Sequence, residues 1–221
     1  MSDEAQGGIA DEPLVIYSVG HSNQSLEKFL ALLEAHQIAL LVDVRSSPFS
    51  RYVTYFNRPE LEYAVEHRGI GYRFMGQELG GRPEGTQFYD DEGYVLYYRV
   101  AEAPFFLNGL KRLEQAATDQ RVAIMCSEED PTNCHRRLLI GRVLRERGVL
   151  LRHIRGDGRL QDDAELTASE QPAPQAQLSL WGEPEAEEEQ VEAWKSIRPV
   201  SPRKAPQSSS RRSDEPEYGD W

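Results

Sequence analysis

Three short apolar runs, each ending in polar residues, constrain the fold of this chain more than any other feature. The runs are LVIYSVGH at 14–21, ALLVDVR at 39–45 and RVAIMC at 121–126. Runs of this kind are typical of strands buried on both faces of a sheet, and segments with helical spacing separate them. Strands that alternate with helices pair in parallel through right-handed crossovers. We therefore expect an α/β fold, a three-layer sandwich with a mostly parallel central sheet.

The remaining elements follow from apolar spacing and from helix start and stop signals. Two further runs, GYRFM at 71–75 and LLRHI at 150–154, predict strands, the second being the last strand. Loops are expected where Ser, Pro, Gly and aromatic residues replace periodic patterns, at 46–57 and 77–93. Helices are predicted at 25–38, 58–69, 105–117 and 134–148.

The composition changes near both ends of the chain. The first 12 residues are acidic, and the stretch 166–221 is rich in Glu, Gln, Pro, Ser and Ala, which cannot offset the entropy lost on ordering. We expect one α/β domain at 13–165, between a disordered N-terminus at 1–12 and a disordered tail at 166–221. The net charge of −12 lies mostly in these ends, so the near-neutral domain can still bind an anionic ligand.

No segment indicates secretion or membrane insertion. The N-terminus lacks the basic and apolar regions of a signal peptide, and no apolar run approaches membrane-spanning length. The two cysteines are too few for a disulfide framework, and the seven residues between them suit a shared site in a reducing compartment. These features predict a cytoplasmic protein with no membrane partner.

The segment from Cys126 to Arg136 carries the densest set of reactive side chains. It reads CSEEDPTNCHR and joins a predicted buried strand to an amphipathic helix. Free backbone N–H groups and the dipole at a helix N-terminus favour an anion there and lower the pKa of a thiol. Thr132 replaces the arginine of the cysteine-phosphatase signature, which argues against that chemistry. In the structural alternative, Cys126 is a buried strand end and Arg136 lies on a solvated helix face.

A second polar group follows the first two strands. His21 ends the first run, while Asp43 and Arg45 end the second, where strand alternation places both on one face. This carboxylate and arginine form either a buried ion pair or part of a catalytic and phosphate-binding group. Because ligands bind at the carboxyl ends of strands in open α/β sheets, we expect the two groups to form opposite walls of an anion pocket.

The candidate residues at this pocket fall into two roles. The candidate acids, bases and nucleophiles are His21, Asp43, Cys126, Glu128, Cys134 and His135. The candidate phosphate- or substrate-binding residues, which combine guanidinium and hydroxyl groups with a flexible glycine turn, are Ser22, Arg45, Arg51, Gly80, Gly81, Arg82 and Arg136.

No cofactor is predicted, and a divalent metal ion is the open alternative. The side chains of the types that bind zinc are Cys126, Cys134, His135 and His21. Their spacing is not that of a standard zinc pair, because the chain has no C-x-x-C element. No residue is therefore assigned as a metal ligand from the sequence.

Four separated motifs occur in order along the domain. They are YSVGHS at 17–22, VDVRSSP at 42–48, ELGGRP at 78–83 and CSEEDPxxCHR at 126–136. Together they resemble the domain of unknown function 488 family, over residues from about Leu14 to Ile154. The resemblance implies an α/β fold and no particular reaction. The residues that match the family pattern are Gly20, His21, Asp43, Arg45, Arg51, Gly80, Gly81, Cys126, Glu128, Cys134, His135 and Arg136.

One peptide in the predicted tail differs from its polar surroundings. It consists of Gln177, Leu178, Ser179, Leu180 and Trp181. It resembles the peptide by which bacterial repair and replication proteins bind the DNA polymerase sliding clamp, with tryptophan in place of the usual phenylalanine. Such a peptide places leucine and aromatic side chains in apolar pockets, and a flexible tether raises the concentration of the domain near DNA. We therefore expect the sliding clamp as a partner.

These observations lead to one functional hypothesis and two alternatives. We expect a DNA repair or replication-associated protein that acts on nucleic acid or a nucleotide, with base removal or phosphodiester hydrolysis as candidate reactions. The first alternative is a non-catalytic, clamp-tethered DNA-binding adaptor. The second is a thiol-based sulfurtransferase or redox protein, with Cys126 or Cys134 as the nucleophile.

Overall fold

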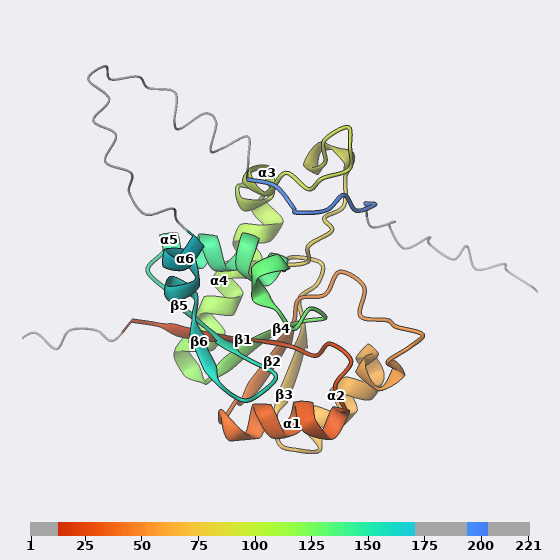
Figure 1. The fold of residues 1–221 in the computed structure, drawn as a ribbon, viewed down its shortest axis with the longest axis vertical. Coiled ribbons are helices and arrows are strands. Elements are labelled where there is room, and N and C mark those ends of the chain that lie inside the picture. The colour runs from red at the N-terminus through yellow and green to blue at the C-terminus, as the bar shows by residue number, and fades with distance from the viewer. Residues whose placement is uncertain (1–12, 171–193, 203–221) are drawn as a thin grey trace, which may run out of the picture.

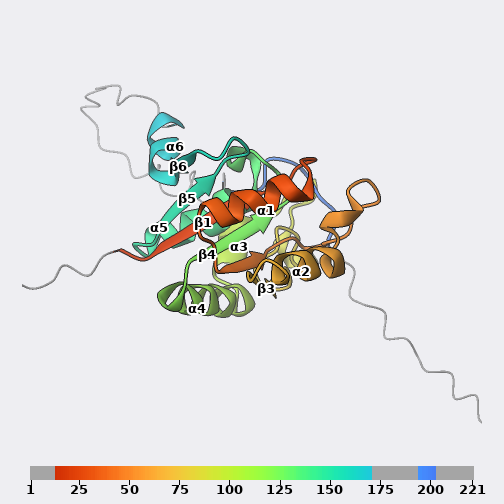
Figure 2. The ribbon, with the colours of Figure 1, turned by 90° about the horizontal axis from the view of Figure 1, so that it is seen from below.

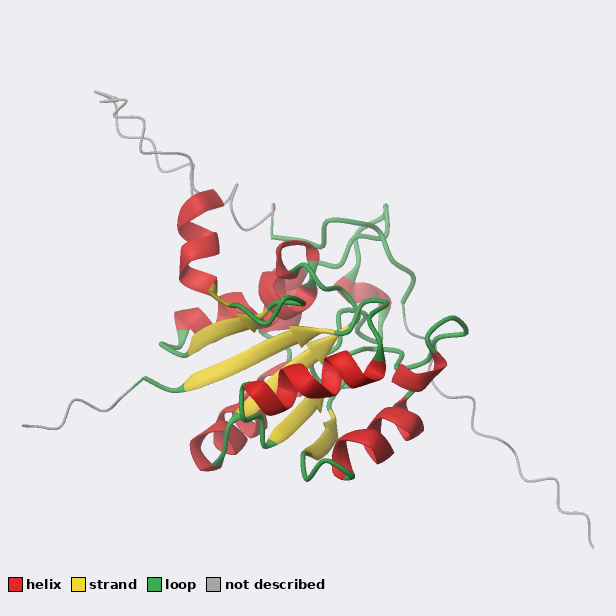
Figure 3. Cartoon of the chain, turned by 60° about the horizontal axis from the view of Figure 1, so that its bottom comes forward, coloured by secondary structure: helices red, strands yellow, loops and turns green. Residues whose placement is uncertain are grey.

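The strands form one sheet in the order β3-β2-β4-β1-β5-β6 in the computed structural model, which describes residues 13–170 and 194–202. All neighbouring strands pair in parallel except β5 and β6. The arrowheads of the parallel strands in Figure 3 point to one edge of the sheet, where connecting loops gather. The predicted mostly parallel sheet is therefore confirmed. The strands are β1 (Val15–Gly20), β2 (Leu40–Asp43), β3 (Gly71–Phe74), β4 (Val122–Cys126), β5 (Leu150–Ile154) and β6 (Leu160–Asp162).

The helices begin where capping residues and prolines favour them. The Ser25 hydroxyl accepts a hydrogen bond from the Lys28 backbone N–H at the start of α1, and α2 and α4 carry proline in their first turn. Within the described residues no helix is both long and apolar enough to cross a membrane. The helices are α1 (Leu26–Ala35), α2 (Arg58–Glu66), α3 (Tyr97–Ala101), α4 (Pro104–Asp119), α5 (Arg142–Glu146) and α6 (Asp163–Glu170). Shorter turns are the 3-10 helices η1 (Thr54–Phe56), η2 (Thr86–Phe88) and η3 (Pro131–Asn133), and the π-helix η4 (Arg136–Gly141), which continues into α5.

Two apolar clusters lie on opposite faces of the sheet. Phe29 from α1 and Leu61 from α2 pack on one face with Met125 of β4. Leu110 from α4 and residues of η4 and α5 pack on the other face with Ile124, the neighbour of Met125 in the same strand. Figure 1 shows α1 and α2 together below the strands, and Figure 2 shows α1 lying across the central strands. This arrangement is the predicted three-layer α/β sandwich.

Two expectations on the C-terminal side need correction. The strand at 150–154 is not the last one, because a turn at residues 156–158 reverses the chain into β6, and Gly158 has a φ of 88°. The domain does not end at residue 165, since α6 continues to Glu170 and residues 194–202 pack against the preceding fold. The predicted N-terminal segment 1–12 and the peptide 177–181 lie outside the described residues.

We call residues 194–202 the C-terminal strap. The Trp194 indole N–H donates to the Leu138 carbonyl at 2.9 Å, and the Arg142 guanidinium lies 4.1 Å from the centre of its ring. The Ser196 backbone N–H donates to the Val95 carbonyl, also at 2.9 Å. In Figure 1 the strap is the blue segment that runs beside α3. These contacts place the strap next to the loops at the carboxyl ends of the strands.

Candidate functional site

The carboxyl ends of β1, β2 and β4 lie side by side, as the sequence predicts. In the sheet register, Gly20 of β1 is the partner of Cys126, and Asp43 of β2 is the partner of Met125. A cavity of about 540 Å³ opens at this edge. The sequence-predicted residues that line it are Arg45, Gly81, Arg82, Cys126, Glu128, Cys134 and His135.

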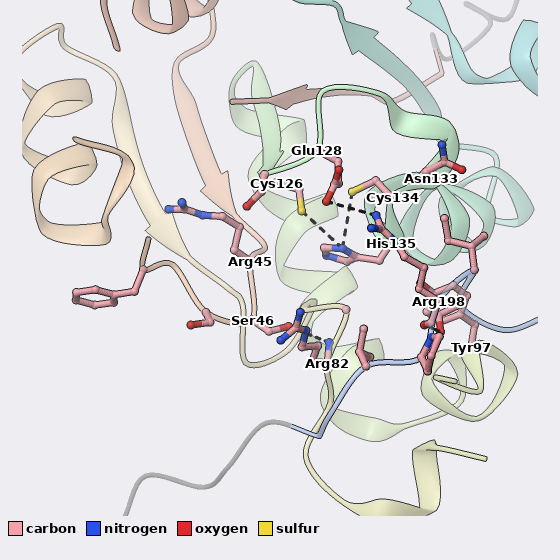
Figure 4. A pocket seen from close by; sticks show the side chains of 18 residues that line it. Arg45, Ser46, Arg82, Tyr97, Cys126, Glu128, Asn133, Cys134, His135 and Arg198 are labelled. Carbon is pink, nitrogen blue, oxygen red and sulfur yellow. Dashed lines mark hydrogen bonds and ion pairs between the residues drawn. The ribbon is translucent and has the colours of Figure 1, made fainter. Parts of the chain in front are cut away.

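Two thiols and one imidazole form the centre of the cavity. The His135 Nε2–H group donates to the Val44 carbonyl at 3.1 Å, so the Nδ1 atom is the one that faces the thiols. Nδ1 lies 3.7 Å from the Cys126 sulfur and 3.8 Å from the Cys134 sulfur, and Figure 4 shows both side chains directed at the ring. An added Cβ at Gly81 would lie 2.8 Å from this ring, which explains why a glycine stands there. We call this group the thiol–imidazole cluster.

The two thiols of the cluster differ in acidity although both are buried. The hydrogen bond to Cys134, together with burial, raises the pKa of Cys126 well above its ordinary value. Burial opposes ionisation of Cys134 too, but hydrogen bonding with Cys126 and His135 lowers the pKa of Cys134 well below its ordinary value. The two shifts have opposite directions because the hydrogen bond between the thiols keeps the proton on Cys126 and favours the ionised form of Cys134.

Asp43, Arg45 and His21 form a buried polar group beside the cavity, and of the three Arg45 is the one that lines it. Arg45 donates to Asp43 from Nη2 at 2.6 Å and from Nε at 2.9 Å, and the Tyr72 hydroxyl donates to the same carboxylate at 2.7 Å. Asp43 is 0 % exposed, and the Arg45 guanidinium points away from the thiols in Figure 4. The carboxylate therefore has its acceptor sites occupied within the fold, which fits the buried ion pair rather than a general base.

His21 belongs to this group and not to the lining of the cavity. Its Nδ1–H donates to the Ser22 carbonyl at 2.7 Å, its Nε2 accepts from Arg45 Nη1 at 3.2 Å, and its ring stacks on Phe56. Burial, followed by the positive charge of Arg45, lowers the pKa of His21 to about 4. The ring is therefore neutral at physiological pH and helps to hold Arg45 in place.

Arg136 is the largest fully buried side chain and is only 1 % exposed. It donates to the Glu128 carbonyl, to the Glu129 carbonyl at 2.6 Å and to the Ser18 hydroxyl at 3.2 Å. The guanidinium therefore holds the loop between the two cysteines, and it neither lies on a solvated face nor reaches the cavity. The remaining predicted binding residues outside the lining are Ser22, Arg51 and Gly80.

The cavity also has walls that sequence reasoning missed. The Ser46 hydroxyl accepts a hydrogen bond from the Arg82 backbone N–H at 2.8 Å, which joins the two loops on one side. The strap supplies another wall, where Arg198 lies 3.8 Å from the Glu128 carboxylate. The sequence features that indicate these residues are the two serines of the VDVRSSP motif and the apolar side chains of the strap within a polar region. The missed lining residues are Ser46, Ser47, Phe49, Tyr97, Ser127, Asn133, Ser196, Ile197, Arg198, Pro199 and Val200.

The fold and the cavity define an α/β protein with a thiol–imidazole cluster at the carboxyl ends of parallel strands. The family described as domain of unknown function DUF488 matches residues 25–143, and the chain belongs to this family. The matched range contains the motifs at 42–48, 78–83 and 126–136, whereas the motif at 17–22 precedes it. Comparisons with curated proteins and with solved structures found no match.

Proposed function

We propose that the protein acts on nucleic acid or a nucleotide at the strand-end cavity. The observation that carries this proposal is the combination of guanidinium groups and an exposed aromatic ring around one cavity. Arg82 and Arg198 line it from two different segments, and Phe49 lines it with 70 % of its surface exposed. Arginine binds phosphate through paired N–H donors, and the volume of about 540 Å³ lies within the range of small-molecule pockets.

The loop at 46–57 supports a single-stranded or extruded base as the ligand. Tyr52, near Phe49 in this loop, is 96 % exposed, and Arg51 between them is exposed as well. Aromatic rings exposed to water make few stabilising contacts within the protein. Unstacked bases of any nucleotide sequence can pack on such rings. Aromatic residues on both sides of an arginine therefore favour a strand whose bases stack while its phosphates contact arginine.

Hydrolysis is the reaction class that suits the side chains in the cavity. Of the predicted acids and bases, Glu128 and His135 line it, while Asp43 and His21 do not. In base removal or phosphodiester hydrolysis, Glu128 would take a proton from the attacking water as its oxygen bonds to carbon or phosphorus and the leaving group departs. Product formation from labelled damaged DNA, with and without added divalent metal, separates such an enzyme from a non-catalytic adaptor.

Arg82→Ala and Phe49→Ala are expected to weaken binding of labelled single-stranded DNA. Loss of one stacked base corresponds to about 1–3 kcal/mol, or roughly 5–150-fold in Kd. Loss of one phosphate contact lowers the slope of the logarithm of affinity against the logarithm of salt concentration by about one. Fluorescence anisotropy at several salt concentrations measures both effects. The matched control is Arg159→Ala, which removes an exposed arginine paired with Asp157 in the turn before β6. Equal losses in the control, or no binding of DNA or nucleotides by the native chain, would refute the proposal.

We further propose that the peptide 177–181 recruits the protein to the bacterial sliding clamp. The support comes from the sequence of the peptide alone, and its position is bounded by α6 on one side and the strap on the other. A clamp-bound peptide would therefore be tied to the domain at both of its ends. This arrangement keeps the cavity near DNA that passes through the clamp.

Leu178→Ala combined with Trp181→Ala is expected to weaken clamp binding at least tenfold. The reason is that both changes remove side chains that fill apolar pockets in this mode of recognition. Surface plasmon resonance with immobilised, purified clamp measures the effect, and Val191→Ala, outside the peptide, serves as the control. DNA binding by the domain should stay unchanged. Clamp binding that survives the double substitution would show that the peptide is not the docking site.

A further inference from the structure

The thiol–imidazole cluster brings a metal-ligand atom from the end of β4 together with two from consecutive residues after η3. The Cys126 and Cys134 sulfurs and the His135 Nδ1 atom all lie within 4.8 Å of one another. From this geometry we propose that the cluster binds one zinc ion, with a fourth coordination position open to the cavity. The metal site stands on these three side chains and does not depend on the identity of the substrate.

The distances from the imidazole to the two thiols match those of a tetrahedral zinc site. Zinc bonds of about 2.3 Å to sulfur and about 2.1 Å to nitrogen, at tetrahedral angles, separate the two ligand atoms by about 3.6 Å. The observed separations from Nδ1 to the two sulfurs are 3.7 and 3.8 Å. A zinc ion would therefore fit between these atoms with only small side-chain movements. Two thiolates and one imidazole are also ligand types that favour zinc over magnesium or calcium.

The surroundings hold the histidine in the orientation that a metal ligand needs. The ring N–H opposite Nδ1 donates to the Val44 carbonyl, the type of outer hydrogen bond that orients metal-bound histidines. Gly81 lies against the same ring and leaves it the room that a larger residue would fill. Arg136 holds the loop between the two cysteines through the Glu128 and Glu129 carbonyls. The cluster is thus supported by Val44 after β2, by Gly81 and by the loop after β4.

His21 is not part of this set, although the sequence offered it as a fourth ligand type. Its ring nitrogens are engaged by Ser22 and Arg45, and its ring stacks on Phe56. Three protein ligands with an open fourth position distinguish catalytic from structural zinc sites. Bound zinc lowers the pKa of water to about 7, which generates a nucleophile at neutral pH.

A catalytic role for the zinc ion rests on the proposed hydrolytic function. Glu128 lines the same cavity and is the carboxylate available to take the proton from zinc-bound water. The water oxygen would bond to the electrophilic carbon or phosphorus of the substrate while the bond to the leaving group breaks. The leaving group takes up the proton that Glu128 carries. This sequence requires no oxidant or reductant.

The metal site is tested with the full chain, purified under reducing conditions and stripped with a chelator. Zinc alone is then added, and bound zinc is measured by atomic emission and by competition with a chromogenic chelator. We expect one zinc ion per chain. Cobalt(II) in place of zinc should give a thiolate-to-cobalt charge-transfer band and the intense d–d bands of tetrahedral coordination. This spectrum of the native chain requires no variant and is therefore independent of any folding defect.

Variants then assign the ligands. Cys134→Ser and His135→Gln are expected to lower zinc affinity at least tenfold and to change the cobalt spectrum. His67→Gln, which alters an exposed histidine bonded to the Tyr63 carbonyl, should leave both unchanged. Circular dichroism of each stripped variant reports whether it is folded before zinc is added.

The results distinguish the metal site from the proposed function. Less than about one tenth of a zinc ion per native chain, or a cobalt spectrum without a thiolate band, would overturn the metal site. Formation of a Cys126–Cys134 disulfide, when a reduced chain that takes up no zinc is treated with oxidised glutathione as the oxidant, would overturn it in favour of thiol chemistry. Stoichiometric zinc with the cobalt spectrum supports the site even if DNA is neither bound nor cleaved, an outcome that overturns the proposed function alone.

Discussion

Asp43→Ala is expected to destabilise the protein by about 3–5 kcal/mol, because the substitution leaves a buried arginine without its partner. Asp43 accepts hydrogen bonds from the Arg45 guanidinium, from the Arg45 backbone N–H at 3.0 Å and from the Tyr72 hydroxyl. No water can replace these contacts easily, because Asp43 is fully buried and Arg45 nearly so. Urea denaturation measures the change in the free energy of unfolding.

Two further variants test the cause of this loss. Asp43→Asn keeps the shape of the side chain but loses its charge, and we expect a smaller destabilisation. Asp157→Ala removes an exposed carboxylate paired with Arg159, and it should change stability little. If Asp43→Ala unfolded at the same urea concentration as the native chain but abolished activity, the carboxylate would be catalytic instead.

Because Asp43 is buried, its substitution cannot distinguish a catalytic protein from a non-catalytic adaptor in cells. Loss of function in an Asp43→Ala strain would follow from unfolding whether or not the protein catalyses a reaction. Glu128→Gln is the better substitution, because the Glu128 side chain is about half exposed and its partner Arg198 lies 3.8 Å away at the surface. It removes a proton acceptor from the cavity with little effect on the core.

The central strands could be predicted from the sequence because their environment dictates their composition. Leu40 to Val42 lie between two helical layers, so each position must be apolar. The edge strand β6 is Leu160–Asp162, half-exposed and short, and it carries no such pattern. The sequence feature that indicates β6 is the Gly-Asp-Gly turn at residues 156–158, which precedes the strand. The strap has no periodic pattern because it is held by a few contacts to segments far away in the chain.

The location of the candidate site could be predicted more fully than the roles of its residues. Parallel strands with the observed register must bring Cys126 close to the end of β2, whatever the side chains do. Whether Asp43 faces the cavity or the interior depends on Tyr72 of β3 and on the rotamer of Arg45, which local sequence does not specify. The approach of His135 to both thiols likewise depends on the turn formed by η3 and η4.

A buried polar network connects the loop of the site to the far edge of the sheet. The Ser18 hydroxyl lies 2.6 Å from His153 Nδ1, and His153 Nε2 lies 3.2 Å from the Asp163 carboxylate. The Arg137 guanidinium donates to the same carboxylate at 3.0 Å. Arg136 joins this network through its hydrogen bond to Ser18. It is therefore the side chain that connects the interior of the sheet to the loop between the cysteines.

Arg136→Met is expected to destabilise the protein by about 3–5 kcal/mol, because it leaves the Glu128 and Glu129 carbonyls and the Ser18 hydroxyl without a charged donor. Gly20 packs against the same loop so closely that an added Cβ would collide with the Glu128 carbonyl oxygen, so the loop has no alternative position nearer the sheet. The loop should therefore detach, which hydrogen exchange of the amides at 127–133 would detect as lost protection.

The position of Arg136 in the family motif predicts phosphate binding, and two further variants separate that role from support of the loop. Arg136→Lys keeps the positive charge but cannot reach all three acceptors, so it should recover only part of the stability. Arg112→Met, which removes an exposed arginine paired with Glu78, controls for the loss of one surface charge. A phosphate-binding arginine would give the opposite result, with normal unfolding and exchange but weaker DNA binding. Loss of stability, of loop protection and of zinc affinity together would instead show that Arg136 supports the cluster by holding the loop that carries it.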